Sequence, residues 1–452
     1  MTDYPRQIPD GPPGEPPPRH IEGWICLSLI ILFVYVGSLS PPKASNQRIS
    51  NVLEAQTGLH QELVAQSLPK PVGNLTAVED PLGPLIRNRR TDPLSAEFYV
   101  AERTLNKLPI AATDLAPIRN SKDPLDRAID EIYSAKQLAA PAIPALTRGI
   151  DSRGFLGRLI VAQAYMRAGD PRPFNRLKSE AGAGSRLLLL IGTIVLVGSP
   201  IACICVAVGW FRRDIRPLGS PIVLRELADS DRFAMRGAQL LTYFLVADVV
   251  AALIAFRFVE REAVTSLLVG IFMLVGVVAL FRLPLFGQTI SLAAIGVQFK
   301  PLGRLVGIGV VGFLIEYPIA LCLATLGNSL FGRFHQATHP VTTQLSESPS
   351  VAYVFAALFM ASVAAPFWEE IMFRGLLFPA LSKLLKSGIW GALVSSFIFG
   401  AIHPQGLPLW LMLMSLGTIS CVLSYYSKSL VPSMTLHALH NAATVAFIIL
   451  QT

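Results

Sequence analysis

Apolar residues form long, nearly uninterrupted runs through the second half of the chain, and polar residues are confined to the segments between them. A membrane-spanning helix needs about 20 apolar residues to cross a hydrocarbon core of about 30 Å. Runs of this kind lie at 187–211, 237–258, 263–281, 304–326, 351–368, 389–403, 407–426 and 430–450. The pattern predicts a polytopic bundle of transmembrane helices, in which the last four spans are short and interrupted by glycine or proline.

The N-terminal part has a different pattern. Residues 1–22 are rich in proline and are expected to be disordered. Residues 23–41 contain one apolar run, which we interpret as a retained transmembrane anchor. A cleaved signal peptide is the alternative, but the start is not compactly basic and no small-x-small cleavage site follows. Residues 43–185 are charged, punctuated by proline and free of long apolar runs, so we predict an extramembrane helical domain there.

Together these segments predict an all-α fold, a transmembrane bundle with a helical domain inserted after the first span. Composition agrees, because hydrophobic residues make up 52% of the chain and charged residues only 15%, against about 25% charged in soluble domains. The net charge of +8 does not require nucleic acid as a partner. Lys and Arg collect in the cytoplasmic loops of membrane proteins, and six arginines crowd the loop 212–236. We therefore expect membrane lipid as the surrounding partner and residues 43–185 on the outer side.

Two adjacent carboxylates, Glu369 and Glu370, stand at the end of the run 351–368. Ionisable residues inside apolar spans are costly and mark candidate functional sites. On a helix the two side chains project about 100° apart, so they are expected to serve different roles. Glu370 and Arg374 are spaced i, i+4, where side chains meet. This pairing leaves Glu369 free to face a cavity, whereas the simpler interpretation makes both glutamates interfacial helix-end residues.

Histidines near the ends of two later spans complete the pattern. Lys386 and Ser387 lie in a polar turn between two apolar helices, with Glu369 about 17 residues before it and His403 about 16 after it. At 1.5 Å per residue, both lie roughly 25 Å from the turn, so an antiparallel hairpin brings them to one level. In the final span, His437 and Asn441 share one helix face as an i, i+4 pair. His440 is turned about 60° from His437 and is the weaker candidate.

The three motifs EExxxR at 369–374, FxxxH at 399–403 and HxxxN at 437–441, in this order, resemble the signature of the CPBP family. Its members include the type II CAAX prenyl endopeptidases and relatives of bacteriocin-processing and immunity proteins. The resemblance covers residues 350–450, and we assign 301–452 to a protease core preceded by transmembrane helices at 187–300. It implies that Glu370 and Arg374 are a structural pair.

The resemblance also implies a reaction. Glu369 would be the general base that activates a water molecule, with His403 helping to hold it. His437 and Asn441 would stabilise the oxyanion formed when this water attacks a peptide carbonyl. The expected substrate is a peptide or protein, prenylated or embedded in the membrane, and the short loops favour a bacterial cell membrane.

A metal-dependent form of this chemistry stays open at this point. If a divalent metal such as zinc is bound, its ligands would be Glu369, His403 and His437, since zinc takes histidine and carboxylate ligands with one open position. Asn441 is a poor zinc ligand, and a water held by hydrogen bonds explains the same residues without metal. The loop histidines His335 and His339 lack the glutamate of an HExxH zinc motif.

Two alternatives of other classes also stay open. One is a catalytically idle relative that serves as a membrane scaffold or immunity factor. The other is a transporter, which the broken spans allow but which predicts inverted repeats that the sequence does not contain. HExxH and GxGD motifs are absent from the sequence, which disfavours two other kinds of intramembrane protease. The intact motifs favour an intramembrane endopeptidase.

Overall fold

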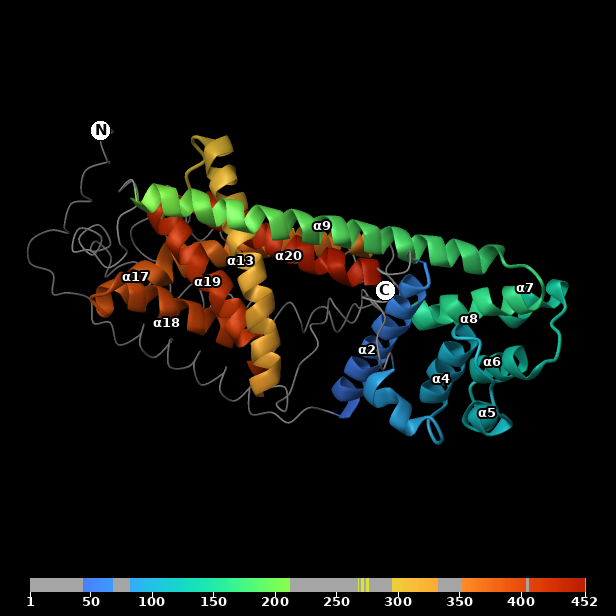
Figure 1. Cartoon of the computed structure of the whole chain (residues 1–452). Coiled ribbons are helices and arrows are strands. Elements are labelled where there is room, and N and C mark those ends of the chain that lie inside the picture. The colour runs from blue at the N-terminus through green and yellow to red at the C-terminus, as the bar shows by residue number, and fades with distance from the viewer. Residues whose placement is uncertain are drawn as a thin grey trace, which may run out of the picture.

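The computed structural model (Figure 1) describes residues 44–67, 82–211, 295–331, 351–403 and 406–451, with five isolated positions between 267 and 275. Helices make up 84% of it, and these residues contain no strand. The prediction of an all-α fold is therefore confirmed. The predicted tail at 1–22, the anchor at 23–41, the arginine-rich loop 212–236 and the run 237–258 lie outside the described residues, as does nearly all of the run 263–281.

The N-terminal helices form one cluster around a continuous apolar core. They are α2 (Ala44–Ala65), η1 (Gly83–Asn88), α4 (Pro93–Leu105), α5 (Ala112–Arg119), α6 (Pro124–Ser134), η2 (Ala140–Ala142), α7 (Ile143–Leu146), η3 (Ile150–Arg153) and α8 (Gly154–Arg167). The starts of α4 and α6 follow one rule: an aspartate caps the helix and a proline occupies its first turn. The capping carboxylate accepts a free backbone N–H, and proline has no N–H to leave unsatisfied.

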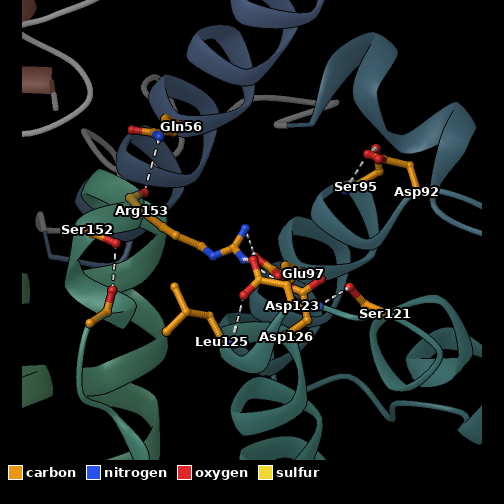
Figure 2. A network of polar contacts seen from close by, with 11 residues as sticks. Gln56, Asp92, Ser95, Glu97, Ser121, Asp123, Leu125, Asp126, Ser152 and Arg153 are labelled. Carbon is orange, nitrogen blue, oxygen red and sulfur yellow. Dashed lines mark hydrogen bonds and ion pairs between the residues drawn. The ribbon is translucent and has the colours of Figure 1, made fainter.

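A polar cluster lies within this helical region (Figure 2). Arg153 reaches the carboxylates of Glu97, Asp123 and Asp126, which come from α4 and from the start of α6. The Glu97 side chain is fully buried. Burial raises the pKa of Glu97 to about 9, and the nearby negative charge of Asp126 acts in the same direction. One guanidinium does not neutralise three carboxylates, so Glu97, the most buried of them, holds a proton.

Helix α9 (Arg172–Phe211) joins the two halves of the structure as one element of 40 residues. At 1.5 Å per residue it is about 60 Å long, and Figure 1 shows it running along the N-terminal cluster and then along the C-terminal helices. Its early residues Leu177 and Ala181 belong to the N-terminal core, whereas Val195 belongs to the C-terminal core. The change from polar to apolar composition near residue 187 occurs inside this helix and not at a break.

The C-terminal helices form a second core. They are α13 (Leu302–Phe331), α15 (Val351–Phe359), η4 (Met360–Ala364), α16 (Ala365–Glu370), η5 (Ile371–Leu377), α17 (Phe378–Leu384), α18 (Gly388–Ala401), α19 (Leu407–Ser427) and α20 (Val431–Gln451). Helix α13 packs against α9, α19 and α20, and α18 packs between α17 and α19. The candidate site residues lie on α16, η5 and α20 and directly after the end of α18.

Four helical stretches of the described chain are long and apolar enough to cross a membrane, namely Arg172–Gly209, Leu302–Phe331, Val351–Ser382 and Leu407–Ser427. Helix α18 is apolar but shorter. The outer surface of α9 exposes large side chains such as Leu190, Leu196 and Ile204. Exposed apolar side chains of this kind are stable when the surrounding solvent is lipid. The chain is a multi-pass membrane protein.

The hairpin of α17 and α18 depends on one glycine. A Cβ atom at Gly391 would lie 2.1 Å from Ser382 Oγ and 2.7 Å from Ser382 Cα. Any larger residue at 391 would therefore push the two helices apart. Ser387 begins α18 by accepting the backbone N–H of Trp390, so the turn and the close packing together fix how α18 runs back beside α17.

Candidate active site

Helix α16 carries both glutamates and is set between two π-helical turns, η4 and η5. In η4 the N–H of Ala365 bonds to Met360 O, five residues earlier. The next residue, Pro366, has no N–H. The carbonyl of Ala361 is therefore deprived of the backbone donors that a regular turn would supply, and it accepts the side-chain amide of Asn441 at 2.7 Å instead. This contact ties α20 to the turn that precedes the glutamates.

Glu369, His403 and His437 converge although they come from α16, the segment just after α18, and α20. The Oε2 atom of Glu369 lies 3.8 Å from His403 Nε2 and 3.7 Å from His437 Nε2. The side chains of Glu369 and His403 are 17% and 18% exposed, and His437 is 3% exposed. Glu369 Oε2 has no hydrogen-bond partner in the described part of the chain. Both nitrogens lie beyond hydrogen-bond distance from Glu369 Oε2, at separations that a small polar molecule can bridge.

In each histidine, the hydrogen bond made by Nδ1 determines the role of Nε2, which is the nitrogen that faces Glu369. His403 Nδ1 lies 2.6 Å from the carbonyl oxygen of Phe399, and a carbonyl only accepts, so this nitrogen donates. His437 Nδ1 lies 2.9 Å from Glu370 Oε1 and donates to that carboxylate in the same way. In neutral imidazole the remaining Nε2 is then an acceptor. Both Nε2 atoms therefore face the carboxylate of Glu369, as acceptors in neutral rings or as donors in doubly protonated rings.

Glu370 and Arg374 form a buried pair behind these residues. Arg374 Nη1 lies 3.0 Å from Glu370 Oε1, and the two side chains are 1% and 0% exposed. The guanidinium carbon also lies 4.5 Å from the centroid of the Phe399 ring, which is within the range of a cation–π contact. The Phe399 ring in turn lies 4.5 Å from the His403 ring and 5.7 Å from the His437 ring, centroid to centroid. The Phe399 ring thus packs against the Arg374 guanidinium and both imidazoles, while Glu370 contacts His437 directly.

The structure brings together some of the sequence-predicted residues and places others differently. Glu369, His403 and His437 share one site, and Glu370 contacts both Arg374 and His437. Asn441 lies on the same helix as His437, but its amide is directed to Ala361 O. His440 points to another partner, Glu316 of α13, at 2.9 Å.

Glu316 was missed by reasoning from the motifs. It is fully buried in the middle of α13, and Ser415 of α19 lies 3.3 Å from its second oxygen. A signal was present, because Glu316 is the only charged residue between 305 and 331. A single carboxylate in such an apolar run marks a candidate functional residue, as the motif carboxylates do.

Glu369 Oε2 and the two imidazole nitrogens are spaced more widely in this structure than the ligands of a tetrahedral zinc. The donor types are suitable, but two ligands of a tetrahedral zinc at about 2.0–2.1 Å lie about 3.3 Å apart. The separations from Glu369 Oε2 to the two nitrogens are 3.8 and 3.7 Å. Among the described residues, no group of three or more His, Cys, Asp or Glu side chains is arranged to hold a metal ion.

Comparison with known proteins agrees with the motifs. The family model described as type II CAAX prenyl endopeptidase Rce1-like matches residues 351–443, which are 93 of the 452 residues. No curated protein and no solved structure matches the chain. The match contains all three motifs, and it leaves out α13 and the N-terminal helices. The resemblance inferred from the motifs is thereby confirmed over residues 351–443, which are similar to the Rce1-like type II CAAX prenyl endopeptidases.

Proposed function

We propose that the chain is an intramembrane endopeptidase that hydrolyses a peptide bond with a water molecule activated by Glu369. The observation that carries this proposal is the convergence of one buried oxygen of the partly exposed Glu369 side chain and two imidazole nitrogens, at 3.7 and 3.8 Å. A water molecule bound among these atoms can donate one hydrogen bond to Glu369 and the other to His403 Nε2. Such a water is oriented and ready to lose a proton to the carboxylate.

The reaction begins when Glu369 removes a proton from the water and the oxygen attacks the carbonyl carbon of the substrate. The C–O bond forms as the carbonyl π electrons move to oxygen, which gives a tetrahedral oxyanion. His437 in its doubly protonated form donates Nε2–H to this oxyanion, and Glu370 balances the positive charge of the ring through Nδ1. Fixed donors aimed at developing charge contribute a large share of catalysis.

The intermediate then collapses with cleavage of the C–N bond. The proton held by Glu369 passes to the leaving amine, which restores the carboxylate and yields a new carboxyl terminus and a new amino terminus. Asn441 acts indirectly in this reaction, by holding the helices that carry Glu369 and His437. Its amide holds the η4 turn through Ala361 O and thereby the height of α16 relative to α20.

The substrate class follows from the surroundings of the site. Glu369 lies on the stretch Val351–Ser382, which is long and apolar enough to cross a membrane. A substrate must therefore present its peptide bond at membrane depth, either as an apolar peptide or as a peptide carrying a lipid such as a prenyl group. We propose that both kinds are bound and that no metal takes part.

The test uses the full-length chain in liposomes with two probes, a peptide with one apolar span and a farnesylated peptide with a CAAX terminus. We expect wild type to cleave at least one of them, and Glu369→Ala and His403→Ala to lower kcat by about 10²- to 10⁴-fold. Thr418→Ala is a matched control in the same bundle, since its hydroxyl bonds to Met414 O within its own helix. Equal turnover by wild type and both site variants would refute the proposal.

The same assay tests the metal question. Wild-type turnover is expected to survive treatment with 1,10-phenanthroline. Loss of turnover that zinc restores would assign the water activation to a metal and would contradict the metal-free part of the proposal. Absence of turnover by the wild type with every peptide tested would favour an idle relative.

A further inference from the structure

Glu316 lies on a helix outside the segment that matches the Rce1-like family, yet it contacts the helix that carries His437. It is fully buried in α13, and no other charge lies between 305 and 331. An unpaired carboxylate in such surroundings is costly and is retained only with partners. The role of Glu316 is therefore inferred from the residues that it contacts.

Two of these partners come from two other helices. His440 Nδ1 of α20 lies 2.9 Å from Glu316 Oε2, and Ser415 Oγ of α19 lies 3.3 Å from Glu316 Oε1. The Tyr317 ring meets the His440 ring edge to face, with centroids 5.6 Å apart. Because Ser415 contacts the carboxylate and not the imidazole, this group lacks the hydroxyl–histidine contact that a serine nucleophile requires.

The contacts of His437, His440 and Asn441 lie within one arc of α20. At about 100° per residue, the three side chains span about 100° of the helix surface. Their partners belong to three different elements, since His437 bonds to Glu370 of α16, His440 to Glu316 of α13, and Asn441 to Ala361 of η4. Three polar contacts in different directions fix both the rotation and the height of α20.

We propose that Glu316 is a positioning residue for the hydrolytic site. Through His440 it fixes the rotation of α20, so that His437 Nε2 faces Glu369 Oε2. This inference rests on the proposed function, and it extends the working unit of the enzyme from residues 351–443 to α13.

The kinetic test compares kcat and KM for the peptide that wild type cleaves best. Glu316→Ala and His440→Ala are each expected to lower kcat by about 10- to 100-fold with KM nearly unchanged, since a shift of about 1 Å costs up to about 100-fold. The double variant should lose no more than the single variants, because both changes remove one contact. Glu316→Gln keeps an acceptor for His440 Nδ1–H and is expected to recover most of kcat.

Two controls separate positioning from general loss of stability. Ser415→Ala removes the contact of Glu316 that does not lead to α20, and it should leave kcat close to that of wild type. Glu97→Ala removes another fully buried carboxylate, in the N-terminal helices, and should lower thermal stability while kcat stays close to wild type. Wild-type kcat in folded Glu316→Ala, or a Gln variant as impaired as the Ala variant, would overturn the inference.

A spectroscopic arm is independent of turnover. In protein labelled with ¹⁵N-histidine, the ring signals of His437 should shift in Glu316→Ala and return towards wild type in Glu316→Gln. Unchanged His437 signals in Glu316→Ala would overturn the inference even if no peptide is cleaved. If wild type cleaves nothing but the signals shift as expected, the proposed function fails and the positioning role stands.

Discussion

Two glutamates that are adjacent in sequence have different surroundings in this protein. Glu369 is 17% exposed and faces two imidazole nitrogens, whereas Glu370 is fully buried and contacts Arg374 and His437. The helix geometry separates them, because successive side chains point about 100° apart. One carboxylate is thereby available to a water molecule, and the other is committed to holding a histidine.

The buried pair of Glu370 and Arg374 gives a first prediction. Arg374→Met is expected to lower the free energy of unfolding by about 3–5 kcal/mol, because it leaves the carboxylate buried without its cation. The double variant Glu370→Gln/Arg374→Met removes both charges and should recover much of that loss. Unfolding of the full chain in mixed detergent micelles measures both values. A double variant as unstable as Arg374→Met alone would show that the charge is not the cause.

At the residue scale, the sequence predicts some positions well and others poorly. Counting residues to the turn at 386–387 predicts that Glu369 and His403 lie at one level, and the i, i+4 spacing predicts the Glu370–Arg374 contact. Both predictions assume a regular helix, and the Glu370–Arg374 contact forms although η5 is π-helical. The contact of Asn441 with Ala361 depends on an irregular turn, and the contact of His440 with Glu316 depends on how α13 packs. Neither can be derived from spacing within one helix.

The short helix α16 shows how an irregular element serves the site. Its flanking turns η4 and η5 are π-helical, a form that is rare and is frequent at functional sites. The wider turn at η4 and the missing N–H of Pro366 free one carbonyl for a side chain of another helix. The apolar pattern predicts a helix at 351–368 but cannot show that its hydrogen-bond ladder changes at 360.

Pro366→Ala is therefore predicted to disturb the site without removing any side chain from it. The new N–H can bond to Ala361 O, compete with Asn441 and straighten the turn. We expect kcat to fall by about 10-fold or more, since small displacements of catalytic groups are costly. Pro379→Ala is the matched control, because it adds the same N–H within the same helical stretch, in α17 and well after Ala361 in the sequence. Equal kcat values for the two variants would contradict this account of η4.

On the scale of the whole molecule, α9 connects two cores of different character. The N-terminal core encloses the charged cluster around Arg153 (Figure 2), and the C-terminal core encloses the candidate active site. Composition alone predicts where the apolar part begins, near residue 187. It does not predict that a single helix crosses that point, because a change of composition does not show whether the backbone hydrogen bonds continue through it.

The stability of the N-terminal helices is predicted to fall as pH rises towards 9. The pKa of Glu97 is raised from 4.5 to about 9, first by burial, so the folded state holds one more proton than the unfolded state between these values. Stability from this group is complete below about pH 4.5 and is lost as pH rises through the folded pKa. Hydrogen exchange of α4 and α6 amides in the full chain, between about pH 7 and 9, measures the effect.

Glu97→Gln is the matched variant for this measurement. The amide is neutral at every pH, so its stability curve should be flatter than that of wild type over the same range. The buried histidine His60 does not interfere, because its pKa is lowered to about 4. Parallel curves for wild type and Glu97→Gln would assign the pH dependence to another group.

The most direct test of the central claim follows the oxygen atom of the water. Wild-type enzyme cleaves the peptide in water enriched in ¹⁸O, and mass spectrometry determines the mass of the new carboxyl terminus. One ¹⁸O atom is expected in that terminus for wild type, and Glu369→Gln, which cannot accept the proton, should give at least about 100-fold less product. A product of the same yield from Glu369→Gln, or a wild-type product without ¹⁸O, would contradict hydrolysis by a water that Glu369 activates.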